Sequence, residues 1–266
     1  MKFKELLAEK INLPANILPS GYHILGHVLL LKLSKKALRH KKKIGSSILQ
    51  MFPYIKTVAL QKGVSGEFRL PKVEILAGNK NTKTIHRELN CTFKLDASKI
   101  MWSKGNHFER QRMLQIVRPN EIVVDMFAGI GYWSVILSKH AKARWIICLE
   151  KNPKSFNYLI ENISLNKLQN ITAIETDCRN FSTTMKADRI IMGYFPGTLN
   201  FLPYALNISK KGTIIHFHEI AKNHESLKKA ILKHKSLKIT NIRQVKEYSP
   251  SKRHFVFDLE VKHTKF

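Results

Sequence analysis

The sequence predicts an α/β protein in which a small N-terminal α+β domain precedes a doubly wound, mostly parallel sheet. Three observations lead to this fold class. The 266 residues suffice for one large and one small core. Short apolar runs separated by turn residues fill the chain up to about residue 100. Beyond that point strand-like and helix-like segments alternate. We therefore expect two domains, residues 1–99 and residues 100–266.

The N-terminal part carries four strand-like runs between residues 22 and 95, namely HILGHVLLLKL, TVALQ, KVEIL and CTFKLD. Turn-rich segments, KGVSGE and AGNKNTKT, lie between them. Helical pieces are expected at residues 3–10 and 34–51. This pattern is typical of a small, strand-rich α+β domain.

The C-terminal part shows the alternation of a parallel sheet. Strands are predicted at residues 122–127, 145–149, 171–175, 189–192 and 213–218, with helices after the first, second, fourth and fifth. Pro153 stands where the second helix begins, a position that suits proline. Since helices of about ten to fifteen residues connect the strands, the sheet is expected to be doubly wound. An antiparallel pair at residues 237–244 and 254–261 is expected to complete it.

The charge of the chain is strongly unbalanced. There are 46 Lys and Arg against 19 Asp and Glu, a formal net charge of +27. Such an excess favours nucleic acid as a partner, and a Lys-rich proteome, as in a thermophile, is the alternative. The stretch KLSKKALRHKKK, residues 32–43, has seven Lys or Arg and no acid. We expect it and the basic C-terminal segment to contact phosphates; the alternative for the stretch is a solvated helix face.

Cysteine usage and hydropathy exclude several classes. Cys91, Cys148 and Cys178 are too few and too scattered for a disulfide scaffold, and none lies in a CxxC pair that would hold zinc. The start MKFKELLAEKINLP lacks the apolar core of a secretory signal, and polar residues interrupt the most apolar run, residues 24–33. We expect a reduced, cytoplasmic, monomeric protein with no metal and no membrane span.

Acidic residues follow three successive predicted strands. In VVDMFAGIGYWSV a buried strand ends at Asp125 and turns through Gly129 and Gly131 into a helix, whose N-terminus offers free N–H groups. Glu150 ends the next strand, where this fold places an acid for the ribose hydroxyls, and Asp177 follows the third. Three such acids predict a nucleoside site with a neutral or cationic end rather than a phosphate cradle. Loop acids without a ligand are the alternative.

The motifs DMFAGIG, EKNP and the D-C-R after the third strand resemble those of a known enzyme family. They are similar to the class I S-adenosylmethionine-dependent enzymes, with a Rossmann-like methyltransferase fold, that modify position 37 of tRNA in archaea and eukaryotes. The resemblance covers about residues 85–220, including HRELNCTFKLDASKIMWSKGNHFERQRM. It implies S-adenosylmethionine as co-substrate and the anticodon arm of tRNA as partner. Two activities compete: N1-methylation of guanosine 37, and transfer of a 3-amino-3-carboxypropyl group to carbon 7 of 4-demethylwyosine in wybutosine biosynthesis.

The resemblance also implies cofactor contacts. It assigns Ser103 and Arg110 to the cofactor from outside the sheet, Glu150 to the ribose, and Asp177 with the backbone of Cys178 to the adenine; Asp125 and Gly129 line the same site. A guanidinium holds a methionine carboxylate or a substrate phosphate equally well, so both remain open for Arg110. Ser103 suits a helix N-cap as well as a ligand contact, and a solvated helix face is the alternative for Arg110 and Arg112.

The segment DRIIMGYFPGT bears on which reaction occurs. Related methyltransferases carry Asn-Leu-Pro at the end of this strand, and the matching residues here are Gly193 and Tyr194, with Thr198 after them. These residues, and the His-Phe-His-Glu end of IIHFHEIA, resemble the aminocarboxypropyltransferases. The resemblance therefore implies transfer of the aminocarboxypropyl group as the expected reaction, with N1-methylation of guanosine 37 as the alternative. A glycine without a side chain would let the methionine arm swing so that its γ-carbon, not its methyl group, meets the nucleophile. A core aromatic is the alternative for Tyr194, and a satisfied buried histidine for His216.

No residue is identified as the general base. His216, His218 and Glu219 are candidates by position alone, and we assign no catalytic residue. Residues 195–197 are expected to supply an aromatic surface on which a flipped base stacks. A relative that binds tRNA without catalysis is a further alternative, although it would have no chemical reason to retain the three acids and the glycine turn.

Overall fold

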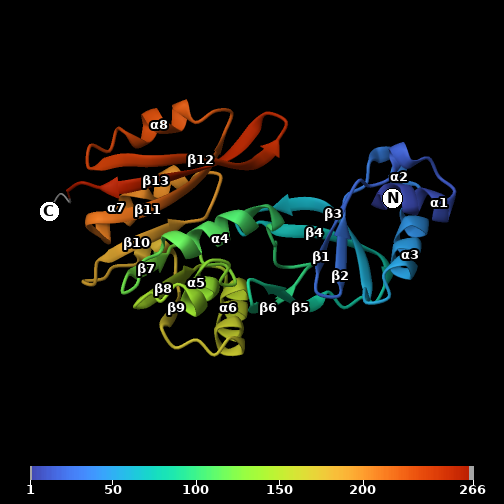
Figure 1. The fold of residues 1–266 in the computed structure, drawn as a ribbon, viewed down its shortest axis with the longest axis horizontal. Coiled ribbons are helices and arrows are strands. Elements are labelled where there is room, and N and C mark those ends of the chain that lie inside the picture. Colours follow the sequence, from blue (N-terminus) through green and yellow to red (C-terminus); the bar gives the residue numbers. More distant parts are fainter. Residues whose placement is uncertain (1, 264–266) are drawn as a thin grey trace. The chain divides into compact units, whose positions relative to one another are not determined.

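The computed structural model describes residues 2–263 of the chain. The chain divides into two compact units, one up to Lys104 and one from Gly105 onward, both drawn in Figure 1. The division falls slightly later than the boundary that we predict after residue 99. The larger unit has the doubly wound α/β architecture expected from the sequence, and the smaller one mixes helices and strands.

The smaller unit is built on two sheets. The first has the order β1-β2-β3-β4, in which β2 and β3 are parallel and the other neighbours antiparallel. Its strands are β1 Tyr22–Leu25, β2 Val28–Leu31, β3 Thr57–Ser65 and β4 Leu70–Gly78. The second sheet pairs β5 Lys83–Glu88 with β6 Cys91–Asp96. The strand β5 was not predicted, because most of its residues are polar. Its hydrogen-bonded pairing with β6 identifies it as a strand.

Helices cover the first sheet of this unit. The predicted helix at residues 34–51 is two helices, and the structure has α1 Phe3–Ile11, α2 Lys35–Leu38 and α3 Lys41–Met51. The Ser34 hydroxyl accepts a hydrogen bond from the Ala37 N–H and so begins α2. Apolar residues of α1 and α3, among them Leu7 and Ile48, pack with strand residues such as Val58 into one core. At Gly45 the backbone of α3 comes so close to β4 that a Cβ would lie 2.6 Å from the Cβ of Leu76.

The larger unit contains one seven-stranded sheet with the order β12-β13-β11-β10-β7-β8-β9. From β9 to β11 neighbouring strands are parallel, and β13 and β12 follow antiparallel, as predicted. The bounds are β7 Ile122–Asp125, β8 Trp145–Glu150, β9 Ile171–Glu175, β10 Ala187–Met192, β11 Ser209–Ala221, β12 Leu237–Ser249 and β13 Lys252–Val261. The strand order reverses between β7 and β10, and ligands of such sheets bind at the carboxyl ends of the strands there.

Helices pack on both faces of this sheet (Figure 1). One face carries α4 His107–Ile116, α5 Ser134–His140 and α6 Pro153–Leu165, and the other carries α7 Leu202–Asn207 and α8 Glu225–Ile231. Asn152 caps α6, with Pro153 in its first turn. Each face has its own apolar core, so the sheet is buried on both sides at its centre.

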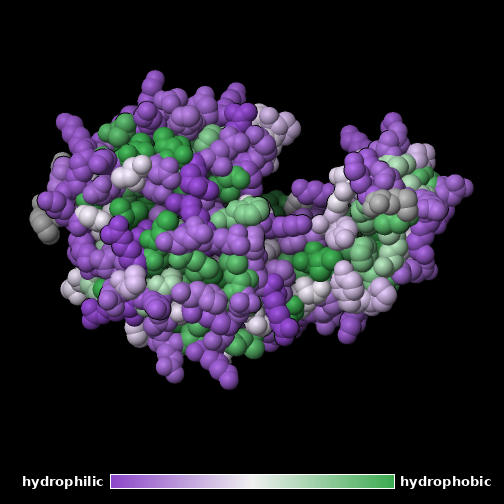
Figure 2. All heavy atoms as spheres, viewed as in Figure 1, coloured by the Kyte–Doolittle hydropathy of each residue, from purple (hydrophilic) through white to green (hydrophobic). Residues whose placement is uncertain are grey.

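Figure 2 shows hydrophilic side chains over most of the visible face of the larger unit. In the smaller unit most of the basic side chains of residues 32–43 are exposed. No helix within residues 2–263 is long and apolar enough to cross a membrane. The same residues contain no group of three or more His, Cys, Asp or Glu placed to hold a metal ion. The three cysteines are buried, and no disulfide joins them.

The close approach at Gly45 gives a test of the packing of α3. Gly45→Ala adds a methyl group that must displace Leu76, so it is expected to lower the free energy of unfolding by about 1–3 kcal/mol, although alanine favours helices. Ser46→Ala, at an exposed position in the same helix, is the matched control and should change it by less than about 0.5 kcal/mol. Urea unfolding of both variants measures the difference, and a stabilised Gly45→Ala protein would contradict the close packing.

Candidate active site

The turn that follows β7 is held by the carboxylate of Asp125. This side chain is fully buried, and it accepts hydrogen bonds from the Ser134 hydroxyl at 2.5 Å and from the Phe127 N–H at 3.3 Å. Gly129 has a φ of +60°, in the left-handed region that favours glycine. Asp125 thus joins the end of β7 to the start of α5, and the glycine turn lies between them.

Glu150, at the end of β8, fastens the same turn from the neighbouring strand. Its Oε2 accepts a hydrogen bond from the Gly129 N–H at 2.6 Å, and its Oε1 accepts one from the Asn152 N–H at 2.7 Å. The side chain is only partly buried. A carboxylate has further lone pairs on each oxygen, so Glu150 retains capacity to accept hydrogen bonds from hydroxyl groups of a ligand.

The two carboxyl groups titrate unusually. Burial is the largest cause that raises the pKa of Asp125, to about 7; the nearby charge of Glu150 acts in the same direction, and the hydrogen bonds from Ser134 and Phe127 oppose the shift. Burial also raises the pKa of Glu150, although the N–H groups of Asn152 and Gly129 oppose this shift. A site with two carboxyl groups of raised pKa stabilises a cationic ligand, because a positive charge favours their ionised forms.

Asp177 follows β9, the next strand of the sheet, and is tied to basic side chains. Its carboxylate accepts hydrogen bonds from the Arg179 guanidinium at 2.9 and 2.6 Å and pairs with Lys151 at 3.0 Å. The hydrogen bond from Arg179 holds the pKa of Asp177 well below its usual range. Cys178 is buried, and burial raises the pKa of its thiol to about 12. The acids predicted at the ends of three strands therefore do lie on adjacent strands, β7, β8 and β9.

The loop after β10 is anchored by Glu219 of β11. One oxygen of this buried carboxylate accepts the N–H of Gly197 at 2.9 Å and that of Thr198 at 2.8 Å. The Thr198 hydroxyl donates a hydrogen bond to the Tyr194 carbonyl. Glu219, a candidate base by position, therefore acts as the support of this loop in the structure.

The aromatic surface at this edge differs from the expected one. Phe195 is 4% exposed and lies against His254, with ring centroids 4.4 Å apart, so it offers no free face for a base. Tyr194 instead stacks on Phe127 at 5.1 Å, and Phe201 meets Phe127 edge-on at 5.0 Å. All three rings are partly exposed. Phe127 and Phe201 were missed as site residues, although Phe127 is part of DMFAGIG and its position next to Asp125 was a usable signal.

The side chain of Trp133 lies directly beside Gly193 and would meet a side chain at that position. A Cβ built on Gly193 would lie 2.9 Å from the Trp133 Nε1. Trp133 is 4% exposed and precedes the first residue of α5, and its ring is 5.3 Å from that of His218. Glycine at position 193 therefore leaves room for the bulky ring of Trp133.

His216 lies in a chain of buried charged groups beneath α4. Its Nδ1 is 2.6 Å from Asp258 and its Nε2 is 2.7 Å from Arg189. Arg112 bonds Asp258 at 2.8 Å, and Arg189 pairs with Glu121 at 2.6 Å. Burial lowers the pKa of His216, so the ring is neutral, donating to Asp258 and accepting from Arg189. The alternative of a satisfied buried histidine describes His216 in the structure.

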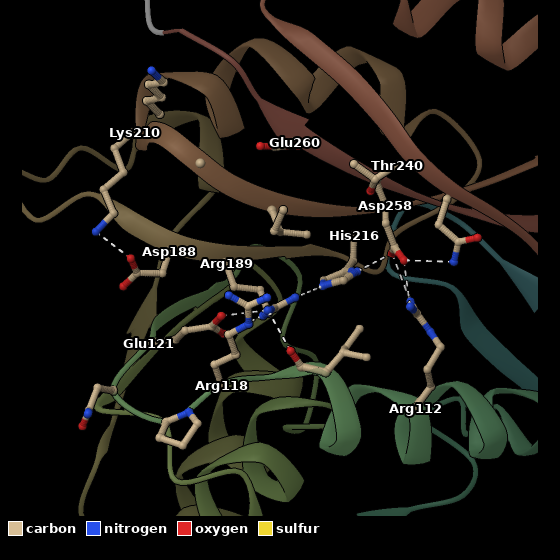
Figure 3. A pocket seen from close by; sticks show the side chains of 17 residues that line it. Arg112, Arg118, Glu121, Asp188, Arg189, Lys210, His216, Thr240, Asp258 and Glu260 are labelled. Atoms are coloured by element: carbon tan, nitrogen blue, oxygen red, sulfur yellow. Dashed lines mark hydrogen bonds and ion pairs between the residues drawn. The ribbon is translucent and has the colours of Figure 1, made fainter.

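This chain of groups lines a cavity of about 780 Å³, shown in Figure 3. Residues at the amino ends of β7, β10 and β11 surround it, among them Glu121, Asp188 and Lys210. Since these strands are parallel, the cavity opens at the edge of the sheet opposite to Asp125 and Glu150. It is separate from the candidate site.

Two predicted cofactor contacts lie outside the sheet. Arg110 belongs to α4 and is 1% exposed, so neither it nor Arg112 lies on a solvated helix face, and that alternative was wrong. Ser103 belongs to the smaller unit, near its end. The contacts of Ser103 and Arg110 with a cofactor remain predictions.

Comparison with protein families and known structures connects this geometry to relatives. The profile of the TRM5/TYW2 methyltransferase domain matches residues 84–245, and that of the TYW2 N-terminal domain matches residues 3–82. The chain belongs to the TRM5/TYW2 family. The family resemblance of DMFAGIG and EKNP, and the class I methyltransferase fold that it implies, are thereby confirmed.

Two relatives and one solved structure agree with this membership. The tRNA(Phe) (4-demethylwyosine(37)-C(7)) aminocarboxypropyltransferase of Methanocaldococcus jannaschii is 44% identical over 203 residues, 73% of this chain and 81% of the relative. The enzyme of the same name from Pyrococcus horikoshii is 38% identical over 268 residues, which are 97% of this chain and 94% of the relative. The crystal structure of P. horikoshii TYW2 in complex with MeSAdo superimposes with a TM-score of 0.84 at 35% identity, covering 98% of this chain and 99% of that one.

The buried charges give a prediction for pH dependence. Burial alone would raise the pKa of Asp258, but hydrogen bonds from His216 and Arg112 hold it well below its usual range. A carboxyl group with a depressed pKa stabilises the fold above its unfolded pKa of about 3.9, and this contribution is lost as the pH falls through the folded value. Asp258→Asn should cost about 3 kcal/mol at pH 7, and the difference from the wild type should narrow below about pH 4.

Glu260→Gln provides the control for this experiment. Glu260 is on the same strand but only reaches Lys238 at 4.0 Å, so its loss should cost less than about 1 kcal/mol. Chemical unfolding at pH 7, 4 and 3 measures both variants. A difference for Asp258→Asn that stays constant over this range would contradict the charged pair.

Proposed function

We propose that this protein transfers the 3-amino-3-carboxypropyl group of S-adenosylmethionine to carbon 7 of 4-demethylwyosine at position 37 of phenylalanine tRNA. The observation that carries this proposal is that both units match: the larger one matches the TRM5/TYW2 domain, and the smaller one matches the N-terminal domain of TYW2 in particular. The match to the two relatives named for this activity extends over 81% and 94% of the length of those relatives.

The residues of the larger unit fit S-adenosylmethionine as a substrate. We assign Glu150 to the ribose hydroxyls, because its carboxylate can accept further hydrogen bonds, and Gly129 to a close approach of the backbone. Asp177 with the backbone of Cys178 is assigned to the adenine. Asp125 and Glu150 favour the sulfonium charge because it lowers their raised pKa values. Ser103 and Arg110 are proposed as further contacts. MeSAdo, seen in the P. horikoshii TYW2 crystal, is the thioether that remains when the aminocarboxypropyl group leaves.

The reaction is a displacement at a carbon bonded to the sulfonium. Carbon 7 of the base forms a bond to the γ-carbon of the methionine arm, the γ-carbon–sulfur bond breaks, and its electron pair neutralises the sulfur. The base then loses the proton of carbon 7. Position and alignment supply most of the rate in such a step. His216 is unsuited as the base because both of its nitrogens are engaged. The stacked Tyr194 and Phe127 are the proposed surface for the substrate base.

The products released from S-adenosylmethionine test the reaction. Purified protein, incubated with S-adenosylmethionine and tRNA that carries 4-demethylwyosine, is expected to release methylthioadenosine in proportion to the base modified, as measured by liquid chromatography and mass spectrometry. S-adenosylhomocysteine as the product would instead identify a methyltransferase, and the same assay on tRNA with guanosine 37 would confirm that alternative. Cofactor binding without either product would identify a non-catalytic tRNA-binding protein.

The basic stretch of the smaller unit is the proposed contact for tRNA phosphates. Lys42 and Lys43 are exposed on α3, so Lys42→Glu/Lys43→Glu should weaken tRNA binding and reduce the slope of log K against log salt by about one or two units. Lys139→Glu/Lys142→Glu changes the charge equally at two exposed positions at and just beyond the end of α5, outside both basic segments, and should have a smaller effect. Filter binding over a salt series measures both. Equal losses would mean that the attraction is spread over the whole basic surface.

A further inference from the structure

We propose that Trp133 determines which carbon of S-adenosylmethionine is transferred, by filling a pocket that the methionine arm would otherwise enter. The inference rests on the proposed function. Gly193 lies just beyond the end of β10, where the strand order reverses, and Ile191 of β10 pairs with Asp125 of β7. A ligand held at the ends of β7 and β8 therefore meets Gly193 next.

The Trp133 indole closes the space behind Gly193. Its Nε1 lies 2.9 Å, and its Cδ1 3.6 Å, from the position of a Cβ on residue 193, so a side chain there would meet the ring. The ring is held firmly, because the next residue, Ser134, begins α5 and donates its hydroxyl hydrogen bond to Asp125. A group of this size at this point leaves no room for an aliphatic chain between β10 and α5.

A polar side chain, that of His218, also lies next to the indole. Met192 of β10 pairs with Phe217 of β11, so the residues that follow, Gly193 and His218, continue side by side. The His218 ring is 5.3 Å from that of Trp133, and its Nδ1 is 3.1 Å from a nitrogen of His254. Its Nε2 is buried and has no hydrogen-bond partner among residues 2–263. Buried polar atoms rarely lack a hydrogen-bond partner, because the hydrogen bonds that they lose to water are then not replaced.

In this arrangement the indole fills space beside Gly193, and the polar His218 ring lies next to the indole. Without the ring, the space beside Gly193 would be bordered by the His218 ring, whose Nε2 can bond the ammonium or carboxylate end of a methionine arm. With the ring present, the arm is kept out of this space and lies on the side of Tyr194 and Phe127, where the substrate base is proposed to stack. The γ-carbon then meets carbon 7. An arm inside the pocket would instead leave the methyl group facing the base.

The chemistry differs only in the bond that breaks. Transfer of the arm breaks the γ-carbon–sulfur bond and releases methylthioadenosine, and transfer of the methyl group breaks the methyl–sulfur bond and releases S-adenosylhomocysteine. In both cases the sulfur takes the electron pair and the base loses one proton. The ratio of the two products therefore reports the position of the arm directly.

Trp133→Leu tests the proposal. The variant should release methylthioadenosine about a hundredfold more slowly and should form S-adenosylhomocysteine in a reaction that depends on tRNA. Trp133→Phe, which keeps a ring in the pocket, should still release methylthioadenosine alone. Trp145→Leu is the matched control, because Trp145 is 38% exposed at the start of β8, and both its rate and its product should equal those of the wild type.

Other outcomes overturn the proposal. A Trp133→Leu protein that loses rate but forms only methylthioadenosine would show that the indole is structural. If that variant fails to fold, as judged by circular dichroism, Gly193→Ala examines the same contact, because its methyl group must displace the indole; methylthioadenosine as its only product would contradict the inference. These results are read against a wild type that releases methylthioadenosine. A wild type that releases S-adenosylhomocysteine contradicts the proposed function itself.

Discussion

The hydrogen bond between the Ser134 hydroxyl and the buried Asp125 carboxylate is the interaction on which the candidate site depends. It fixes the start of α5 against the end of β7, and the glycine turn between them is then fastened by Glu150 through the Gly129 N–H. The same constraint places Trp133, which comes directly before Ser134, against Gly193 of another strand. The two carboxylates thus join the ends of β7 and β8 to the glycine turn and to the start of α5.

A second set of buried charges stabilises the opposite half of the sheet. Arg189 joins β10 to Glu121 and to the carbonyl of Ile116 at the end of α4, and His216 continues the chain to Asp258 and Arg112. Each member has a partner of complementary character, which is the condition under which buried ions do not destabilise a fold. Glu121 and Arg189 lie near the amino ends of β7 and β10, whereas His216 lies level with Ile191 and Asp125 near the carboxyl ends, where its contacts with Asp258 and Arg189 hold it within the fold.

Local patterns in the sequence predict the sheet and the acids but not the contacts between distant segments. The five parallel strands and the final antiparallel pair follow from apolar periodicity, and Asp125, Glu150 and Asp177 follow from their places at strand ends. The fit of Trp133 into the space of residue 193 joins residues 60 positions apart, and no local pattern announces it. The burial of Phe195 and the exposure of Tyr194 likewise depend on Glu219, whose hydrogen bonds to the loop are visible only in three dimensions. β5 was missed for the same reason, since its partner strand supplies what its own sequence lacks.

The pKa of Asp125 has a consequence for the energetics of ligand binding. A carboxyl group with a pKa of about 7 is about half protonated at neutral pH. A cation that arrives at the ends of β7 and β8 shifts this group toward its ionised form, so binding is accompanied by release of a fraction of a proton to the solvent. The affinity for the cationic ligand then depends on pH. The heat of binding depends in turn on the ionisation enthalpy of the buffer that takes up the proton. Although Asp125 is fully buried, binding of a cation therefore changes its protonation and transfers protons to the solvent.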